Sequence, residues 1–115
     1  MSYNIALAER IRNHLLVFPK LKVNEKKMFG GLAFMVNDKM CICASGENLM
    51  CRFDPEMEKE LVMKKGYLPM IMRGKELKGY CYIEPVGFKV KKDFDYYISL
   101  CLEYNKKAKV SKKKK

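Results

Sequence analysis

The stretch MFGGLAFMVNDKMCICA, residues 28–44, decides the fold of this 115-residue chain. It holds two apolar runs, 28–36 and 40–44, with Asn37 and Asp38 between them. Both residue types tolerate the positive φ that a two-residue β-turn demands, so the stretch predicts an antiparallel hairpin. A second turn near Gly46 leads into another apolar run, and the three runs together predict a three-stranded meander.

An amphipathic helix is predicted before the meander. The apolar residues Leu7, Ile11 and Leu15 recur at four-residue steps, and Ser2 can cap the helix that contains them. The basic segment 20–27 that follows has no clear apolar pattern, and we interpret it as a link.

Two more helices and a second hairpin are predicted after the meander. Asp54 followed by a proline indicates the start of a short helix, and Gly66 marks its expected end. The apolar runs 68–73 and 77–83 flank a Gly-Lys pair and predict a hairpin. Apolar residues at helical spacing predict a last helix over about 93–104.

This order of elements predicts an α+β fold. Strands that follow one another through tight turns pair antiparallel, so we expect an antiparallel sheet of about five strands, formed by the three-stranded meander plus the hairpin. Helices are expected at both termini, and one between the two groups of strands. Residues 1–104 are expected to form a single domain, and 105–115 a disordered lysine-rich tail.

The charge is unevenly distributed. The net charge of +11 comes mostly from the tail, which carries seven lysines and no acid. Such a tail predicts weak, sequence-independent contact with nucleic acid, for which the last four residues are candidates: Lys112, Lys113, Lys114 and Lys115. The sequence shows neither a signal-peptide pattern nor a membrane span, so we expect a cytoplasmic protein that does not bind membranes.

Five cysteines lie inside apolar segments, which indicates reduced thiols rather than a disulfide framework. Four of them could in principle surround a zinc ion: Cys41, Cys43, Cys51 and Cys81. A two-residue turn would place Cys41 opposite Phe34 and Cys43 opposite Leu32, both facing apolar partners. A two-residue loop at 46–47 would put Cys51 on the other face, and a three-residue loop would not. We favour buried thiols, and predict neither a metal nor another cofactor.

No catalytic residue is predicted. His14 is the only histidine, and we interpret it as a border residue of the first helix rather than as half of a nucleophile dyad. Gly30 and Gly31 open a strand and not a helix, so they predict a bend or a close backbone approach rather than a phosphate loop.

Methionines are abundant in the predicted strands. Met35 and Met40 should face each other on the side of the hairpin opposite Phe34, so both faces of the sheet are expected to be apolar. Either helices cover both faces, or one face meets a partner, which would be another protein or a second copy of the chain.

A set of short motifs in the strands is recognisable: Lys27 to Phe34, Lys39-Met40-Cys41, Leu49-Met50 with Arg52, Pro69-Met70, Gly74-Lys75 and Lys78-Gly79. Together they resemble the N-terminal domain of the TfoX/Sxy competence-regulator family, from about Lys26 to Tyr104. Longer members act in natural competence and transcriptional regulation, and the resemblance implies such a role here.

The preferred function is therefore a non-enzymatic interaction module that binds a protein partner. The alternatives are an enzyme, or an accessory to one, that acts on RNA or DNA, and a sequence-specific DNA binder, for which no helix-turn-helix or zinc finger is visible. Basic residues of the body are candidates for contact with nucleic acid or with a partner: Lys27, Arg52, Arg73, Lys75 and Lys78.

Overall fold

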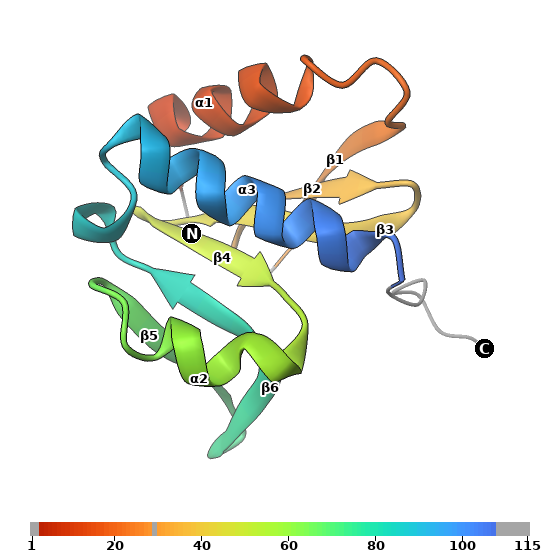
Figure 1. Ribbon diagram of the computed structural model, residues 1–115. Coiled ribbons are helices and arrows are strands. Elements are labelled where there is room, and N and C mark those ends of the chain that lie inside the picture. Colours follow the sequence, from red (N-terminus) through yellow and green to blue (C-terminus); the bar gives the residue numbers. More distant parts are fainter. Residues whose placement is uncertain (1–2, 29, 108–115) are drawn as a thin grey trace.

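The structure is a computed structural model that describes residues 3–28 and 30–107, without the side chain of Met72. Within these residues it has six strands and three α-helices (Figure 1). In chain order the elements are α1 (Ile5–Leu15), β1 (Val23–Met28), β2 (Gly31–Val36), β3 (Lys39–Ser45), β4 (Asn48–Arg52), the 3-10 helix η1 (Pro55–Met57), α2 (Glu58–Leu61), β5 (Tyr67–Met72), β6 (Lys75–Ile83), the 3-10 helix η2 (Pro85–Gly87) and α3 (Lys91–Asn105).

The strands form one antiparallel sheet in the order β1-β2-β3-β4-β6-β5. The α+β prediction is confirmed, with helices near both ends of the described chain and a short one between the strand groups. The hairpin of β5 and β6 joins the meander through its second strand, because β6 pairs with β4. The two edges of the sheet are therefore β1 and β5.

Strand β1 is an additional strand that was not predicted, and the interpretation of residues 20–27 as a link was wrong from Val23 onward. The strand pairs with β2 along its whole length, from Val23 opposite Val36 to Met28 opposite Gly31. Its four central residues are exposed, as expected of a charged edge strand that resists edge-to-edge association. Its pairing with β2 creates the strand, since its own sequence has no apolar alternation.

The turns of the sheet follow the predicted chemistry with one shift. Asn37 and Asp38 have φ of 53° and 68°, which confirms the two-residue turn between β2 and β3. In the second hairpin the turn is formed by Arg73 and Gly74, with φ of 53° and 80°, and not by Gly74 and Lys75. Strand β6 therefore begins two residues earlier than the predicted run.

The glycine pair has two different structural roles, as expected. Gly30 has a φ of +72° in the turn before β2. A Cβ on Gly31 would lie 2.1 Å from the carbonyl oxygen of Ala44, so only glycine allows β2 and β3 to approach this closely here.

A β-bulge in β3 changes the cross-strand pairing of two cysteines and the face of one of them, Cys43. Met35 is opposite Met40 as predicted, but Phe34 is opposite Ile42, so Cys41 is an extra residue between the two pairs. The expected pairing of Cys41 with Phe34 is therefore wrong. Cys43 is opposite Ala33 and not Leu32, and it faces the side of the sheet away from Cys41.

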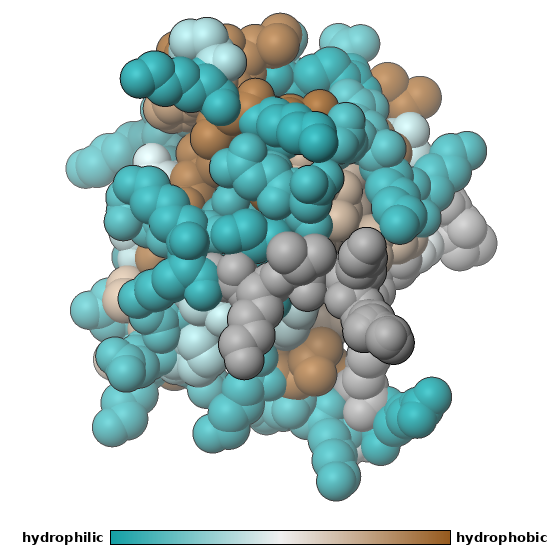
Figure 2. Space-filling model, turned by 90° about the vertical axis from the view of Figure 1, so that its right-hand side faces the viewer, coloured by the Kyte–Doolittle hydropathy of each residue, from teal (hydrophilic) through white to brown (hydrophobic). Residues whose placement is uncertain are grey.

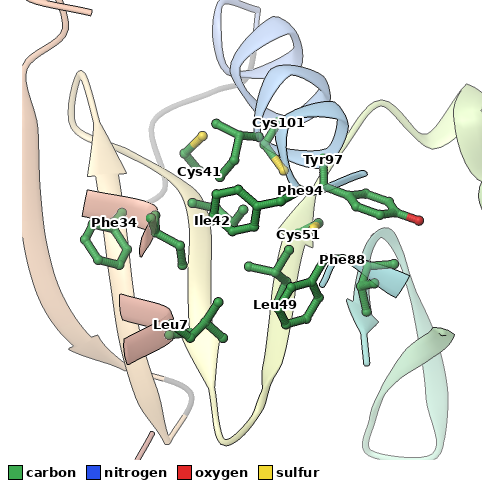
Figure 3. Packing of buried hydrophobic residues seen from close by; sticks show 14 of the residues in the cluster. Leu7, Phe34, Cys41, Ile42, Leu49, Cys51, Phe88, Phe94, Tyr97 and Cys101 are labelled. Atoms are coloured by element: carbon green, nitrogen blue, oxygen red, sulfur yellow. The ribbon is translucent and has the colours of Figure 1, made fainter. Parts of the chain in front are cut away.

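The helices lie over one face of the sheet (Figure 1). Helix α1 is capped by the side chain of Asn4, which accepts a hydrogen bond from the Leu7 amide, whereas the predicted cap Ser2 lies outside the described residues. Its apolar stripe packs on the sheet together with α3, and Figure 3 shows Cys41 and Cys101 between the strands and that helix.

Helix α3 ends one residue later than predicted. Asn105 is 4% exposed, its side-chain amide donates to the Val36 carbonyl at 3.2 Å, and its own carbonyl accepts from Lys39 Nζ at 2.8 Å. The residue expected to begin the tail is therefore a packed part of the last helix.

Candidate functional site

A second apolar cluster lies on the sheet face away from the helices. We call it the methionine face; its buried members are Ala33, Met40, Cys43, Met50 and Met70, and its partly buried members are Met28, Met35, Leu77, Tyr80 and Tyr82. Every one of these residues belongs to a strand, whereas the cluster on the opposite face draws on all three helices. The prediction that both faces of the sheet are apolar is confirmed.

The composition of this face favours adaptable contacts. Methionine is unbranched and polarizable, so it fits partner surfaces of different shapes. Tyr80 and Tyr82 stand on β6 opposite Arg52 and Met50 of β4, and both tyrosines are partly exposed. Leu68, opposite Tyr82 on β5, is 38% exposed and extends the apolar surface toward that edge.

The backbone pairing of Arg52 with Tyr80 puts both residues on one side of the sheet, and the guanidinium also comes close to α3, the helix that packs on the other side. Its guanidinium carbon lies 5.7 Å from the ring centre of Tyr80 and 5.7 Å from that of Tyr104, near the end of α3. Its Nη1 atom is buried and has no hydrogen-bond partner among residues 3–28 and 30–107. The contact with Tyr104 is a tertiary one for which the sequence gives no signal.

The other predicted basic residues do not form one patch with Arg52. Lys27 lies on the exposed edge strand β1 opposite Leu32, whose side chain packs on the helix-covered face. Arg73, Lys75 and Lys78 are exposed in the β5–β6 hairpin, at the other edge of the sheet. The tail candidates lie outside the described residues: Lys112, Lys113, Lys114 and Lys115.

The five cysteines are buried with free thiols. Hydrogen bonds with the thiols of Cys101 and Cys81, together with burial, raise the pKa of the Cys51 thiol. Burial raises the pKa of Cys43 to about 12 and also raises that of Cys41. These shifts disfavour the thiolate, the form that attacks substrates or binds zinc. Within residues 3–28 and 30–107 no group of three or more metal-ligating side chains has the geometry of a metal site.

His14 lies at the border of the core, between α1 and α3. Its ring centre is 5.9 Å from those of Phe18 and Phe94. Its Nδ1 atom is 3.2 Å from Asp95 Oδ1, although that oxygen accepts no hydrogen bond, so the contact is electrostatic when the histidine is protonated. The acid next to His14 was not foreseen, because Asp95 comes from the far end of the chain.

The hollows on the helical side include two of more than 250 Å³. One of about 380 Å³ has a basic lining with Asp93 and Tyr97, between the segment after α2 and the start of α3. The other, of about 260 Å³, lies between the end of α1 and α3 and includes Phe18, Leu21 and Leu102. Neither brings a cysteine or a histidine to its wall, so the two hollows offer no nucleophile dyad.

The outer surface is largely hydrophilic where α1 and α3 end, with small apolar areas between the charged side chains (Figure 2). Among the helices of the described residues, none is long and apolar enough to cross a membrane.

Comparison with known proteins gives one match. Residues 19–104 fit the family model of the TfoX N-terminal domain, which covers well over half of the chain and includes every strand of the sheet. No curated protein and no solved structure matches the chain. The chain belongs to the TfoX N-terminal domain family.

Proposed function

We propose that this protein is a non-enzymatic interaction module that binds another protein through the methionine face. The observation that carries the proposal is that an apolar cluster built only from strand residues lies on the face away from the helices. Its partly exposed apolar side chains supply the kind of grouped apolar surface that meets protein partners.

Charge favours an acidic partner over a second copy of the chain. The protein carries a net charge of +11, so two copies repel each other at long range. Arg52 adds a positive charge next to the apolar surface. An acidic protein surface with apolar side chains at its centre complements both features.

The lysine-rich tail supports a second, weaker interaction. Its charge attracts phosphate groups without reading base sequence, so we expect it to add a salt-sensitive affinity for nucleic acid. By family resemblance, the combined activity would serve regulation of transcription or of natural competence in the cell.

The test compares two matched variants in affinity purification from cells that produce the protein. Tyr82→Glu places a carboxylate on the methionine face, whereas Leu16→Glu places one at the C-cap of α1, at a residue that is already 72% exposed. Capture of the protein partner should fall at least about tenfold with Tyr82→Glu, because the new charge is desolvated at the interface. Leu16→Glu should leave capture unchanged.

Two outcomes count against the proposal. Equal capture by wild type and Tyr82→Glu would remove the methionine face from the interaction. A dimeric mass by light scattering that reverts to monomer with Tyr82→Glu would show that a second copy occupies the face instead of another protein.

A further inference from the structure

The guanidinium of Arg52 lacks an anionic partner within the described part of the chain. Its Nη1 is buried without a hydrogen bond, and no ion pair joins Arg52 to an acid there. Buried polar groups are nearly always paired, and an unpaired charged donor is costly, so this group calls for an acceptor.

The acids closest to it along the chain and around Tyr104 are already used. Asp54, two residues after Arg52, accepts from the Glu56 amide at 3.0 Å and pairs with Lys107 Nζ at 3.0 Å. Glu103, next to Tyr104, pairs with Lys106 at 3.2 Å. The acceptor for Arg52 must therefore come from elsewhere.

Backbone oxygens at the end of α3 already accept hydrogen bonds from other donors. The Asn105 carbonyl accepts from Lys39 Nζ at 2.8 Å, and the Tyr104 carbonyl accepts from the Lys107 amide at 3.0 Å. The rings of Tyr80 and Tyr104 flank the guanidinium of Arg52, and its Nε and Nη2 groups, which do not share the burial of Nη1, remain available to a ligand.

The chemistry around Arg52 selects the ligand class. A carboxylate has one charge and two coplanar oxygens, which match the planar fork of a single guanidinium. A phosphate group presents more charge and more oxygen atoms than this one group can satisfy. The two tyrosine rings and the neighbouring apolar cluster reduce contact with water, which strengthens a single charge-assisted pair.

We propose that Arg52 is a carboxylate-binding residue and that it pairs with one carboxylate of the protein bound on the methionine face. That the carboxylate belongs to a protein partner rests on the proposed function, whereas the carboxylate site at Arg52 does not. The carboxylate belongs to an acidic side chain or to a chain end of the partner.

The experiment follows the Nε–H signals of the arginine side chains in ¹⁵N correlation spectra of the wild-type chain. Sodium acetate is titrated against sodium chloride at constant ionic strength, and sodium phosphate is titrated in parallel. Arg73 is the matched control because it is exposed at a turn. Arg12 is the second control because Glu25 already holds its guanidinium.

Acetate should shift the Arg52 signal in a saturable way, by at least about three times the shift at Arg73, and leave Arg12 unchanged. A linear response of Arg52 equal to that of Arg73 would overturn the site. Saturation by phosphate at lower concentration than by acetate would overturn the assignment to carboxylates.

Two further probes separate the sources of the carboxylate. N-acetylglutamate α-amide carries a side-chain carboxylate, and N-acetylleucine carries a chain-end carboxylate beside an apolar group. Tighter binding of either than of acetate supports the site and identifies its source. Failure of both to shift the Arg52 signal would overturn the proposal.

The variant Arg52→Lys keeps the positive charge but removes the planar guanidinium fork. Acetate binding to this variant is followed through the backbone amide signal of Tyr80. Acetate affinity at that amide should fall about tenfold, and an unchanged affinity would overturn the role of Arg52.

The two proposals can fail separately. If acetate saturates Arg52 but Tyr82→Glu still captures the partner fully, the proposed function is refuted and the carboxylate site stands. If Tyr82→Glu loses capture but acetate does not saturate Arg52, the carboxylate site is refuted and the proposed function stands.

Discussion

Cys51 and Cys81 are direct cross-strand partners on β4 and β6, and the neighbouring thiols of Cys101 and Cys81 raise the pKa of the Cys51 thiol inside the core. Three thiols from two strands and a helix therefore meet where the sheet packs against α3. This contact makes the cysteines part of the packing between layers.

The first prediction concerns thiol reactivity. All five cysteines are buried, and the pKa of the Cys51 thiol is raised, so the folded protein should react with Ellman's reagent only through unfolding. All five thiols should react rapidly in denaturing urea. The rate across a urea series should follow unfolding measured by circular dichroism, and fast labelling of a native thiol would contradict the description of the core.

The second prediction is a loss of stability at alkaline pH. Burial raises the pKa of Cys43 to about 12 from an ordinary value near 9, so the folded state keeps a proton that the unfolded state releases. The contribution of Cys43 to the free energy of unfolding is complete below pH 9. It is lost between pH 9 and 12, at about 1.4 kcal/mol per pH unit. Urea unfolding with a reductant should show a decline over this range, and Cys43→Ala should make it less steep without removing it, since the thiol pKa values of Cys41 and Cys51 are raised as well.

The third prediction compares two glycines. Gly31→Ala should destabilise the protein by about 3 kcal/mol, because its Cβ would clash with the backbone of β3. Gly46→Ala meets open space at a φ of +57°, so it should cost only about 1 kcal/mol. Equal midpoints in urea unfolding for both variants would contradict the close approach of β2 and β3.

The fourth prediction concerns the end of α3. Asn105→Ala removes the donor to the Val36 carbonyl and should lower the free energy of unfolding by about 1–2 kcal/mol. Lys106→Ala, which breaks only an exposed ion pair with Glu103, should change it by less than about 0.5 kcal/mol. Urea unfolding measures both, and similar effects would show that Asn105 adds little to the packing.

The fifth prediction concerns the tail. Truncation after Lys107 keeps α3 whole, whereas truncation after Tyr104 would also remove buried Asn105. A single-stranded DNA oligonucleotide should bind the full chain with a steep salt dependence, and the shorter chain should lose most of it. Fluorescence anisotropy at several salt concentrations measures the slope, and an unchanged slope would place the DNA contact in the folded body.

The sequence predicted the parts of the fold that local chemistry determines. The turn at Asn37 and Asp38, the cap at Asp54 and the apolar stripe of α1 are each set by residues close together in the chain. Strand β1 escaped prediction because its exposed residues gain their structure only from pairing with β2. The bulge at Cys41 escaped it because the residues around it are all apolar and fit either face.

The candidate site was predicted only in part. The apolar character of both sheet faces followed from the facing pair Met35 and Met40. The candidate patch of basic residues assumed that its members gather in space, but the strand order puts Lys27 and Arg73 at opposite edges of the sheet. The position of the Arg52 guanidinium beside Tyr104 could not be predicted, because this contact with α3 is made by tertiary packing.

The two edge strands restrict how this protein can assemble. Strand β1 exposes charged side chains, and β5 contains Pro69, which has no backbone N–H to offer a neighbouring strand. Lengthening of the sheet from molecule to molecule is opposed at both ends. We therefore expect discrete complexes of fixed stoichiometry, even at the high concentrations at which flat apolar sheets form fibres.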